Sequence, residues 1–337
     1  MRSRHLKVLV LFDTAGTPPV DQDFSRELAT PDWKAEANVI AALRRLGHEV
    51  RTIGVFDEPG LIVNELRGHP PDLVFNLTEH FNNRSAYDRD VAGLLEMLDV
   101  RFTGSGPTGL TLCKNKGMAK EILSYHRVSV PNFAIFPPGA AIRRPKRLAF
   151  PLFIKPLKEE ASYGIAQGSF VETDTAFEER VRFIHEHMNQ EALAEEYIDG
   201  RELYVSILGN HRLRVFPLRE VIFTEIPEGQ PRFATFKAKW DEAYRQRWGI
   251  QNIDAQPLPD GIEERIARIC KRVYRVLRMR SYGRIDLRLT PAGRIFVLEA
   301  NPNPNLAQDD EFAQSALAAG VSFDALVQRI VNLAFPP

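Results

Sequence analysis

The stretch GRIDLRLTPAGRIFVLEANPNPN, residues 283–305, decides the fold prediction because it has the pattern of a β-hairpin. Its turn falls at residues 291–293, Pro-Ala-Gly. Symmetric antiparallel pairing around this turn predicts three facing pairs: Asp286 with Glu299, Arg284 with Asn301, and Arg288 with Val297. Like charges directly across a ladder repel each other. A hairpin that keeps two carboxylates opposite each other therefore predicts a cation between them.

The residues around this pair indicate which cation the hairpin binds. The carboxylates of Asp286 and Glu299 and the amide oxygen of Asn301 are hard ligands of the kind that Mg²⁺ takes in proteins. A protein-bound Mg²⁺ often also holds the phosphates of a substrate. The first hypothesis is therefore a nucleotide-dependent enzyme whose metal site lies on this hairpin.

The alternative is an ordinary half-exposed hairpin. Strand alternation places the charged residues 284, 286 and 288 on one face and the apolar residues 285, 287 and 289 on the other, as such a hairpin would also show. The second strand favours the metal site. Alternation there puts Ile295, Val297, Glu299 and Asn301 on one face, so that a carboxylate follows two apolar residues on the same side.

Composition narrows the class of partner. The chain has 337 residues, enough for two or three domains, and its 44 basic residues balance 44 acidic ones. This balance gives no overall attraction to nucleic acid or to an anionic membrane, so small molecules are the expected partners. Two cysteines are present and the first apolar run is too short for a signal or membrane segment, which suits a cytoplasmic protein.

Apolar periodicity predicts three successive blocks. Residues 1–112 alternate strand-like and helix-like segments, beginning with the strand-like LKVLVLFD, and this indicates a parallel α/β domain. Residues 113–202 and 203–337 mix strands and helices without strict alternation, which favours two α+β domains. The spacing predicts helices over 32–46, 114–125, 175–188, 262–277 and 323–333, the first of them stopping at Gly47.

The stretch GSGPTG at 104–109 matches the dinucleotide fingerprint G-x-G-x-x-G. That motif needs an acidic residue about 20 positions later for the ribose, and no acid lies between Ser124 and Pro138. We interpret the stretch as a turn into a helix, with Pro107 near the first helical position. A Walker-type phosphate loop is also missing from the sequence, so other residues must hold the phosphates of a nucleotide.

Two lysines and two glutamates are candidates for binding a nucleotide. Lys155 ends the apolar run FPLFI, and Lys116 lies in the first turn of a predicted helix. Either lysine could instead be an ordinary solvated side chain. Glu195 and Glu202, in LAEEYIDGREL, are spaced to accept a base amine and the ribose hydroxyls, although a charged strand edge would give the same pattern.

Together these motifs resemble the ATP-grasp superfamily, and D-alanine:D-alanine ligases most closely, over nearly the whole chain. The resemblance is carried by FNL at 75–77, FTGSG at 102–106, Lys116, FPLFIKP at 150–156, EEYIDGREL at 195–203, AKW at 238–240, GRIDLRL at 283–289 and FVLEANPNP at 296–304. It implies an ATP-grasp fold. An N-terminal parallel α/β domain would precede two α+β domains that enclose ATP, a central lid domain and a C-terminal catalytic domain.

The resemblance also implies roles for individual residues. For ATP they are Lys116 and Lys155 on phosphate and adenine N7, Glu195 on the adenine amino group, the backbone at Ile198 on the adenine edge, Glu202 on the ribose, and Ser162 in the flap loop over the phosphates. For the reaction they are Lys239 on the terminal phosphate, Arg284 at the reacting centre, and Asp286, Glu299 and Asn301 on two Mg²⁺ ions, with Mn²⁺ as an alternative ion. Relatives of this kind are often homodimers.

The substrate end departs from the ligase pattern. The loop DTAGTPPVDQD at 13–23 replaces one that carries a glutamate, Ala161 replaces a flap serine, and Trp240 replaces a tyrosine. The serine that binds the carboxylate of the second substrate falls at Asp310, next to Glu311, and an acid there would repel a carboxylate. We therefore expect a second substrate with an extra positive charge. The alternative is that these acids only cap the helix that follows.

The resemblance implies an ATP-dependent carboxylate-amine ligase, which activates a carboxylate as an acyl phosphate and joins it to an amine. Arg284 and a backbone N–H near Asn305 would stabilise the oxyanion. The substrates are expected to differ from two D-alanines. Two alternatives stay open: a true D-alanine:D-alanine ligase, and a nucleotide-binding regulatory protein without turnover. The intact Lys155, Asp286, Glu299 and Asn301 argue against the second.

Overall fold

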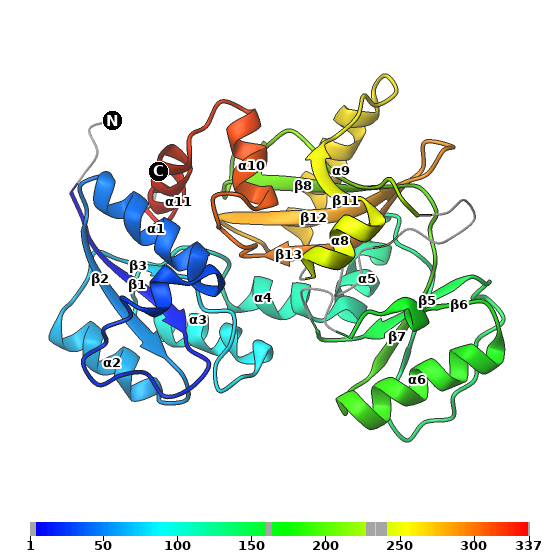
Figure 1. Cartoon of the computed structure of the whole chain (residues 1–337), viewed down its shortest axis with the longest axis horizontal. Coiled ribbons are helices and arrows are strands. Elements are labelled where there is room, and N and C mark those ends of the chain that lie inside the picture. Colours follow the sequence, from blue (N-terminus) through cyan, green and yellow to red (C-terminus); the bar gives the residue numbers. More distant parts are fainter. Residues whose placement is uncertain (1–4, 160–163, 227–232, 234–240, 336–337) are drawn as a thin grey trace.

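The computed structural model describes residues 5–159, 164–226, 233 and 241–335. In these residues the strands form three sheets, which Figure 1 shows as a blue sheet at the N-terminal end, a small green sheet, and a large sheet that includes the orange hairpin. The architecture confirms the predicted combination of a parallel α/β part with α+β parts.

The first sheet has the order β2-β1-β3 and consists of β1 (Lys7–Asp13), β2 (Glu49–Val55) and β3 (Leu73–Asn76). Both neighbours pair with β1 in parallel. The helices of this part are α1 (Lys34–Arg45), α2 (Pro59–Gly68) and α3 (Asp88–Met97). The predicted glycine stop is confirmed, since Gly47 follows α1 with a φ of 83°. The sequence prediction missed α2, and its helix over 32–46 began within residues 31–33, which form a 3₁₀ turn before α1.

The second sheet is antiparallel and has the order β4-β7-β5-β6. Its strands are β4 (Phe133–Phe136), β5 (Leu152–Pro156), β6 (Phe170–Val171) and β7 (Ala192–Glu196). Helix α6 (Asp174–Met188) covers this sheet by burying Phe177, Val181 and Ile184 in one cluster with Leu152 and Ile154. Two consecutive helices, α4 (Pro107–Lys114) and α5 (Lys116–Tyr125), lead into it from the first sheet (Figure 1).

The third sheet has the order β11-β10-β8-β12-β13, with β9 paired to β8. Its strands are β8 (Arg201–Leu208), β9 (Arg214–Val215), β10 (Arg219–Phe223), β11 (Ile250–Asp254), β12 (Tyr282–Leu289) and β13 (Ile295–Pro302). The remaining helices of the described residues are α8 (Glu242–Trp248), α9 (Ile262–Val276), α10 (Glu311–Ala318) and α11 (Phe323–Leu333). The sequence prediction missed α8 and β11, which are short elements with weak periodicity, and it gave α4 and α10 only as the helices that follow Gly106 and Asp310.

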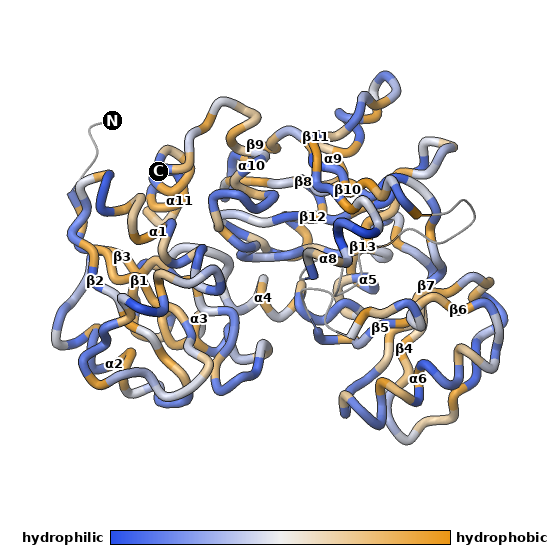
Figure 2. Tube along the Cα trace, viewed as in Figure 1, coloured by the Kyte–Doolittle hydropathy of each residue, from blue (hydrophilic) through white to orange (hydrophobic). Residues whose placement is uncertain are grey.

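The chain returns to its N-terminal sheet at the end. Helix α11 buries Leu326, Ile330 and Val331 in one cluster with Val8 and Val10 of β1. Figure 2 shows the hydrophobic segments in α11 and along β1 that make this core. The packing joins the first and last elements of the described chain, and the same cluster contains Leu208 and Tyr282 of the large sheet.

The hairpin of β12 and β13 forms as predicted at the end away from its turn. Asp286 faces Glu299 and Arg284 faces Asn301. The third predicted pair is wrong, because Arg288 faces Phe296 and Leu287 faces Val297. The register shift between Asp286 and Leu287 leaves Leu298 as an extra residue on β13, which is a β-bulge.

The bulge also corrects the prediction that Ile295, Val297, Glu299 and Asn301 share one face. An extra residue reverses the alternation, so Val297 and Ala300 both pack in the core beneath the sheet with Ile285 and Leu287. Glu299 and Asn301 are only partly buried. The Glu299 carboxylate therefore lies off the apolar face of the strand, and the bulge places it opposite Asp286.

The glycine-rich stretch is a turn, as predicted. Gly106 precedes α4 and Pro107 takes the first helical position. Gly104 has a φ of 90°, and a Cβ there would lie 2.7 Å from Oδ1 of Asn303. The same Asn303 oxygen accepts a hydrogen bond of 2.7 Å from the backbone N–H of Ser105. The glycine thus allows the segment after the hairpin to approach the turn before α4.

Candidate active site

A cavity of about 90 Å³ lies between the second sheet, β4-β7-β5-β6, and the third, large sheet. We call the second sheet the central sheet. Several residues that the sequence analysis singled out line it, namely Lys155, Glu195, Ile198, Glu202, Asp286 and Glu299. Apolar side chains that the sequence analysis did not name complete the lining, among them Phe153, Ile165 and Phe233. Rings and aliphatic side chains beside a few convergent charges are the usual composition of a small-molecule site.

On the central sheet, Glu195 binds two lysines. Lys155 on the neighbouring strand β5 places its Nζ 2.8 Å from Oε1 of Glu195, and Lys120 on α5 places its Nζ 2.9 Å from Oε2. All three residues are buried. The alternative of a solvated Lys155 is therefore wrong. A charged strand edge is also wrong for Glu195, because β7 lies between β4 and β5.

Burial and the neighbouring charges have opposite effects on the pKa values of Glu195, Lys155 and Lys120. Burial alone would raise the pKa of Glu195, but Lys120 and Lys155 outweigh burial and hold it below its ordinary value. Burial alone would lower the pKa of Lys155, but Glu195 and Glu299 outweigh burial and raise it. For Lys120 burial outweighs the attraction of Glu195, and the pKa of this lysine is lowered. Glu195 is thus an ionised acceptor at neutral pH.

On the large sheet, Glu202 is held by Arg288 and Tyr204. The carboxylate lies 2.6 Å from Nη2 of Arg288 and accepts a hydrogen bond of 3.1 Å from the Tyr204 hydroxyl. Glu202 belongs to β8, which pairs with both β10 and β12, so it too is not on a strand edge. A buried carboxylate fixed by two donors is a rigid acceptor, which suits recognition of hydroxyl groups.

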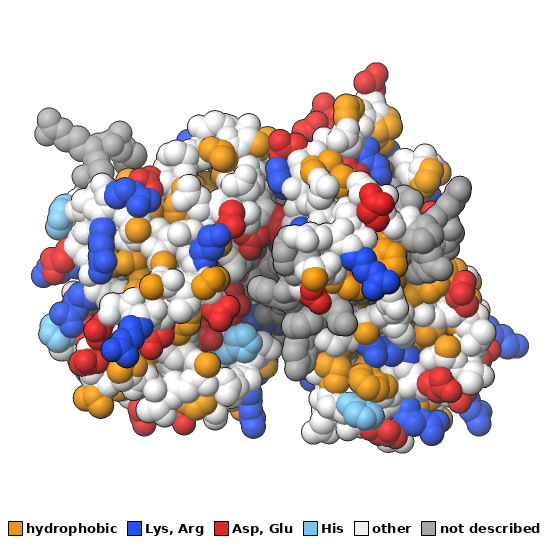
Figure 3. Space-filling view, viewed as in Figure 1, with side chains coloured by type: hydrophobic (Ala, Val, Ile, Leu, Met, Phe, Trp, Pro, Cys, Tyr) orange, Lys and Arg blue, Asp and Glu red, His pale blue; other side chains and the backbone are white. Residues whose placement is uncertain are grey.

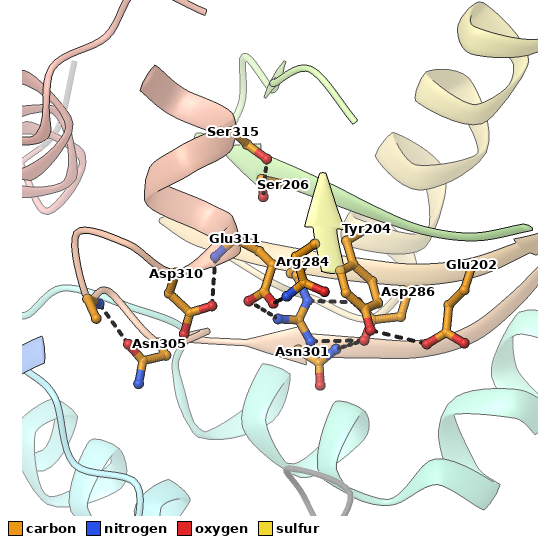
Figure 4. Close-up of polar contacts among 12 residues, drawn as sticks. Glu202, Tyr204, Ser206, Arg284, Asp286, Asn301, Asn305, Asp310, Glu311 and Ser315 are labelled. Carbon is orange, nitrogen blue, oxygen red and sulfur yellow. Dashed lines mark hydrogen bonds and ion pairs between the residues drawn. The ribbon is translucent and has the colours of Figure 1, made fainter. Parts of the chain in front are cut away.

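Arg284 occupies the centre of the hairpin site (Figure 4). Its guanidinium binds both oxygens of Asp286, at 2.8 and 3.0 Å, and Glu311 lies 3.4 Å away on its other side. Burial alone would lower the pKa of Arg284, but Asp286 and Glu311 outweigh burial and raise it. The guanidinium also lies 4.7 Å from the ring centroid of Tyr204. Arg284 is therefore a fixed, permanently charged group beside the predicted metal ligands.

Asp286, Glu299 and Asn301 have the chemistry of a divalent-ion site. The side-chain N–H of Asn301 donates a hydrogen bond of 3.0 Å to Asp286, and Lys116 lies 3.0 Å from Glu299. Lys116 is itself buried, so the alternative of a solvated lysine is wrong here as well. Among the described residues no group of three or more His, Cys, Asp or Glu side chains could hold a metal by itself. Two carboxylates and an amide fit Mg²⁺ that takes its other ligands from phosphates and water.

The acids after the hairpin have mainly local partners. Asp310 is the N-cap of α10 and accepts a hydrogen bond of 2.6 Å from the backbone N–H of Glu311, as the capping alternative predicted. Glu311 reaches both Arg284 and the side-chain amide of Asn252. Burial, together with Glu311, raises the pKa of Asp310 well above its ordinary value. Asn305 is exposed and accepts a hydrogen bond of 2.7 Å from the backbone N–H of Ala307, which makes a turn.

Figure 4 shows how this part of the site is arranged. Asp310 and Glu311 lie at the start of α10, Arg284 lies between Glu311 and Asp286, and Asn305 lies farther along the connecting loop. Figure 3 shows acidic side chains gathered beside the junction between the N-terminal part and the rest of the molecule. Lys239, Trp240 and Ser162 lie outside the described residues, as does Ala161 of the flap loop.

Lys120, Tyr204 and Arg288 were not assigned to the site from the sequence. Lys120 follows Lys116 at a spacing of i, i+4 on α5, a spacing that puts both lysines on one face of a helix. Tyr204 lies two positions after Glu202 on β8, and Arg288 lies two positions after Asp286 on β12, so each shares a face of its strand with a residue already singled out. Helical spacing and strand alternation could therefore have identified all three residues as neighbours of the site.

No single helix in the described ranges is long and apolar enough to cross a membrane; α10 and α11 pass such a test only as a pair bent by 105°.

The comparisons with known proteins agree with this geometry. The model of the family described as D-ala D-ala ligase C-terminus matches residues 126–332. An uncharacterized protein of Sinorhizobium fredii is 32% identical over 315 residues, which cover 90% of this chain and 88% of that protein. The D-alanine–D-alanine ligase of Desulforudis audaxviator is 30% identical over 300 residues, which cover 88% of this chain and 91% of that enzyme.

Solved structures share the fold at lower sequence identity. The D-alanine–D-alanine ligase from Bacillus anthracis complexed with ATP has a TM-score of 0.75 and 20% identity, covering 98% of this chain and 97% of that one. The VanG D-Ala:D-Ser ligase from Enterococcus faecalis has a TM-score of 0.73 and 19% identity, covering 98% and 100%. The family match and the curated relatives show that the chain belongs to the D-alanine–D-alanine ligase family of ATP-grasp enzymes, which form C–N bonds.

Proposed function

We propose that the protein joins a carboxylate to an amine at the expense of ATP, and that its substrates are not two D-alanines. One observation carries this proposal: Asp286 faces Glu299 across the β12–β13 ladder at the edge of a cavity that also contains Lys155, Glu195 and Glu202. The acids on the hairpin suit an ion held with phosphates, and the other residues suit a nucleotide. The division into domains at residues 112 and 202 belongs to the same proposal.

The nucleotide would bind between the two sheets. Lys116 and Lys155 would contact its phosphates and adenine N7, while Glu195 and the backbone at Ile198 would contact the adenine. Glu202 would accept hydrogen bonds from the ribose, because Arg288 and Tyr204 hold its carboxylate in place. Ser162 and Lys239 would complete the phosphate contacts.

The reaction would take place beside the hairpin. Asp286, Glu299 and Asn301 would hold Mg²⁺, two ions by analogy with the family, and the metal would neutralise charge on the transferring phosphoryl group. Arg284 would stabilise the reacting centre, because its charge is fixed and its planar guanidinium offers several donors. A substrate carboxylate would take the γ-phosphoryl group of ATP and release ADP, which gives an acyl phosphate. The amine would then attack the acyl carbon and lose a proton, and inorganic phosphate would leave as the amide forms. A backbone N–H near Asn305 would help to stabilise the oxyanion.

The second substrate would be an amine with a further positive charge. Two carboxylates, Asp286 and Glu311, bind the guanidinium of Arg284, and the acidic side chain of Asp310 precedes Glu311 directly. A bound ammonium would favour the ionised form of Asp310, which supports a site for an added positive charge. Trp240 would lie near this substrate. A D-alanine or D-serine as second substrate is the main alternative, and the names of the relatives favour it. An inactive nucleotide-binding regulator is the other alternative.

A matrix of carboxylates and amines, scored by release of ADP, tests the proposal. We expect ADP only when an acid and an amine are both present, and a preference for amines with a distal ammonium over neutral analogues. Release with D-alanine alone would support the D-alanine ligase. Binding of ATP without ADP release for any pair would support the regulator. Because the reaction uses ATP, we place it in the cytoplasm, with a homodimer as the proposed form.

A further inference from the structure

We propose that Lys120 is a positioning residue, which keeps Glu195 paired and in place while Lys155 turns to the nucleotide. The inference rests on the proposed binding of ATP. It concerns a residue with no assigned part in the site, and it explains why one buried glutamate has two lysine partners.

Lys120 is fixed by more than its ion pair. Its Nζ lies 2.9 Å from Oε2 of Glu195 and donates a hydrogen bond of 3.1 Å to the backbone carbonyl of Leu298, the bulged residue of β13. Only 2% of its side chain is exposed. The lysine therefore connects α5, the central sheet and the large sheet through one ammonium group.

Lys120 and Lys155 differ in their access to the cavity. Lys155 and Glu195 are among the described residues that line it, and Lys120 is not. A ligand in the cavity can therefore reach Lys155 and Glu195, whereas Lys120 stays behind them. Of the two lysines on Glu195, Lys155 is the one that can exchange its carboxylate partner for a phosphate.

The exchange would leave Glu195 with Lys120 as its single counter-ion. Without Lys120 the buried carboxylate would have no partner, which is strongly unfavourable, and Glu195 would take up a proton or hold on to Lys155. With Lys120 in place, Oε2 stays paired and Oε1 becomes available to accept a hydrogen bond from the adenine amino group. Lys120 would thus allow one glutamate to release a lysine and to recognise a base at the same time.

Nucleotide binding to the full-length protein tests this role without any turnover. Isothermal titration calorimetry with Mg²⁺ would compare ATP with purine riboside triphosphate, which lacks only the exocyclic amino group. We expect the wild-type protein to prefer ATP by about tenfold or more, as for a hydrogen bond to a charged acceptor. In Lys120→Met, Glu195 retains Lys155, and the preference is expected to fall to about twofold or less.

A merely structural lysine would give a different result. If Lys120→Met weakens the binding of both nucleotides by the same factor, or leaves the preference unchanged, the proposal is wrong. Lys120→Arg keeps the charge and is expected to keep most of the preference. Should the methionine variant fail to fold, an arginine variant that folds but does not discriminate would overturn the proposal equally well.

One control variant and the behaviour of the wild-type protein separate this inference from the proposed function. Lys146 is an exposed lysine in the loop before β5, and Lys146→Met is expected to bind both nucleotides as the wild type does. If the wild-type protein binds neither nucleotide, the proposed function fails. If the wild type discriminates and Lys120→Met does so to the same degree, only the role of Lys120 is refuted.

Discussion

Lys116, the first residue of α5, places its Nζ 3.0 Å from Oε1 of Glu299 on β13. One helical turn later, Lys120 donates to the carbonyl of Leu298, which precedes Glu299. Two lysines on one face of α5 thus bind two consecutive residues of the bulged strand. The bulge that brings Glu299 into line with Asp286 is therefore supported from outside the hairpin.

Replacement of Glu299 by glutamine is expected to reduce Mg²⁺-dependent ADP release by about a hundredfold or more, because the amide keeps the size of the side chain but not its charge. The measurement is kcat/KM at several Mg²⁺ concentrations. Glu264→Gln, at an exposed position in the first turn of α9, provides a control with the same chemical change. Full ADP release by the Glu299 variant would refute the metal assignment.

Replacement of Arg284 by lysine is expected to reduce kcat by about a hundredfold while the affinity for ATP changes little. An ammonium cannot bind both oxygens of Asp286 and still reach Glu311, as the guanidinium does. Single-turnover rates and ATP titrations on the same protein would separate the two effects. A loss confined to ATP affinity would contradict a role at the reacting centre.

Replacement of Asp310 by serine separates capping from substrate recognition. Serine is also a favourable N-cap, so the thermal stability of the protein is expected to change little. The preference for an amine with a distal ammonium over its neutral analogue should fall by about tenfold, because the variant loses the carboxylate whose ionised form a bound ammonium would stabilise. Asp310→Ala, which loses both functions, is the comparison. An unchanged preference in the serine variant would leave Asp310 with capping alone.

Glu36, in the first turn of α1, is expected to make stability depend on pH. Burial, together with the charge of Asp13, raises the pKa of Glu36 from 4.5 to about 7. The folded state therefore binds this proton more tightly than the unfolded chain does. From pH 4.5 to about pH 7 the free energy of unfolding should therefore fall as pH rises. The fall is at most about 3 kcal/mol, and it is smaller than this because the side chain is partly exposed to solvent.

Glu36→Gln removes this proton-binding difference. Urea unfolding at pH 4.5 and at pH 8 would measure it. The glutamine variant is expected to be more stable than the wild-type protein at the higher pH, and the difference between the two should shrink or vanish at the lower pH. Parallel pH profiles for both proteins would show that Glu36 does not carry the effect.

Local patterns predicted much of the fold. The strand β1, the glycine stop after α1 and the full extent of α11 follow from residues that are close in the chain. The short elements α8, α10 and β11 could not be predicted with the same ease, because their positions depend on partners in other sheets and helices. The alternatives for Lys116 and Lys155 were likewise undecided until burial was known, since a lysine has the same local pattern whether it is solvated or paired.

The sequence by itself determined the hairpin and its turn, because antiparallel pairing around a tight turn is a local property with a period of two residues. The predicted facing of Asp286 and Glu299 is confirmed, but with Leu289 facing Ile295 it depends on the bulge at Leu298. Only the tertiary structure decided which side of the strand Glu299 takes. The bulge at Leu298 reverses that alternation, and its supports lie far away in the chain: the backbone carbonyl of Ser129 accepts from Val297, and Lys120 binds Leu298. An extra residue in a strand is stabilised by such distant partners, and no pattern within the strand records them.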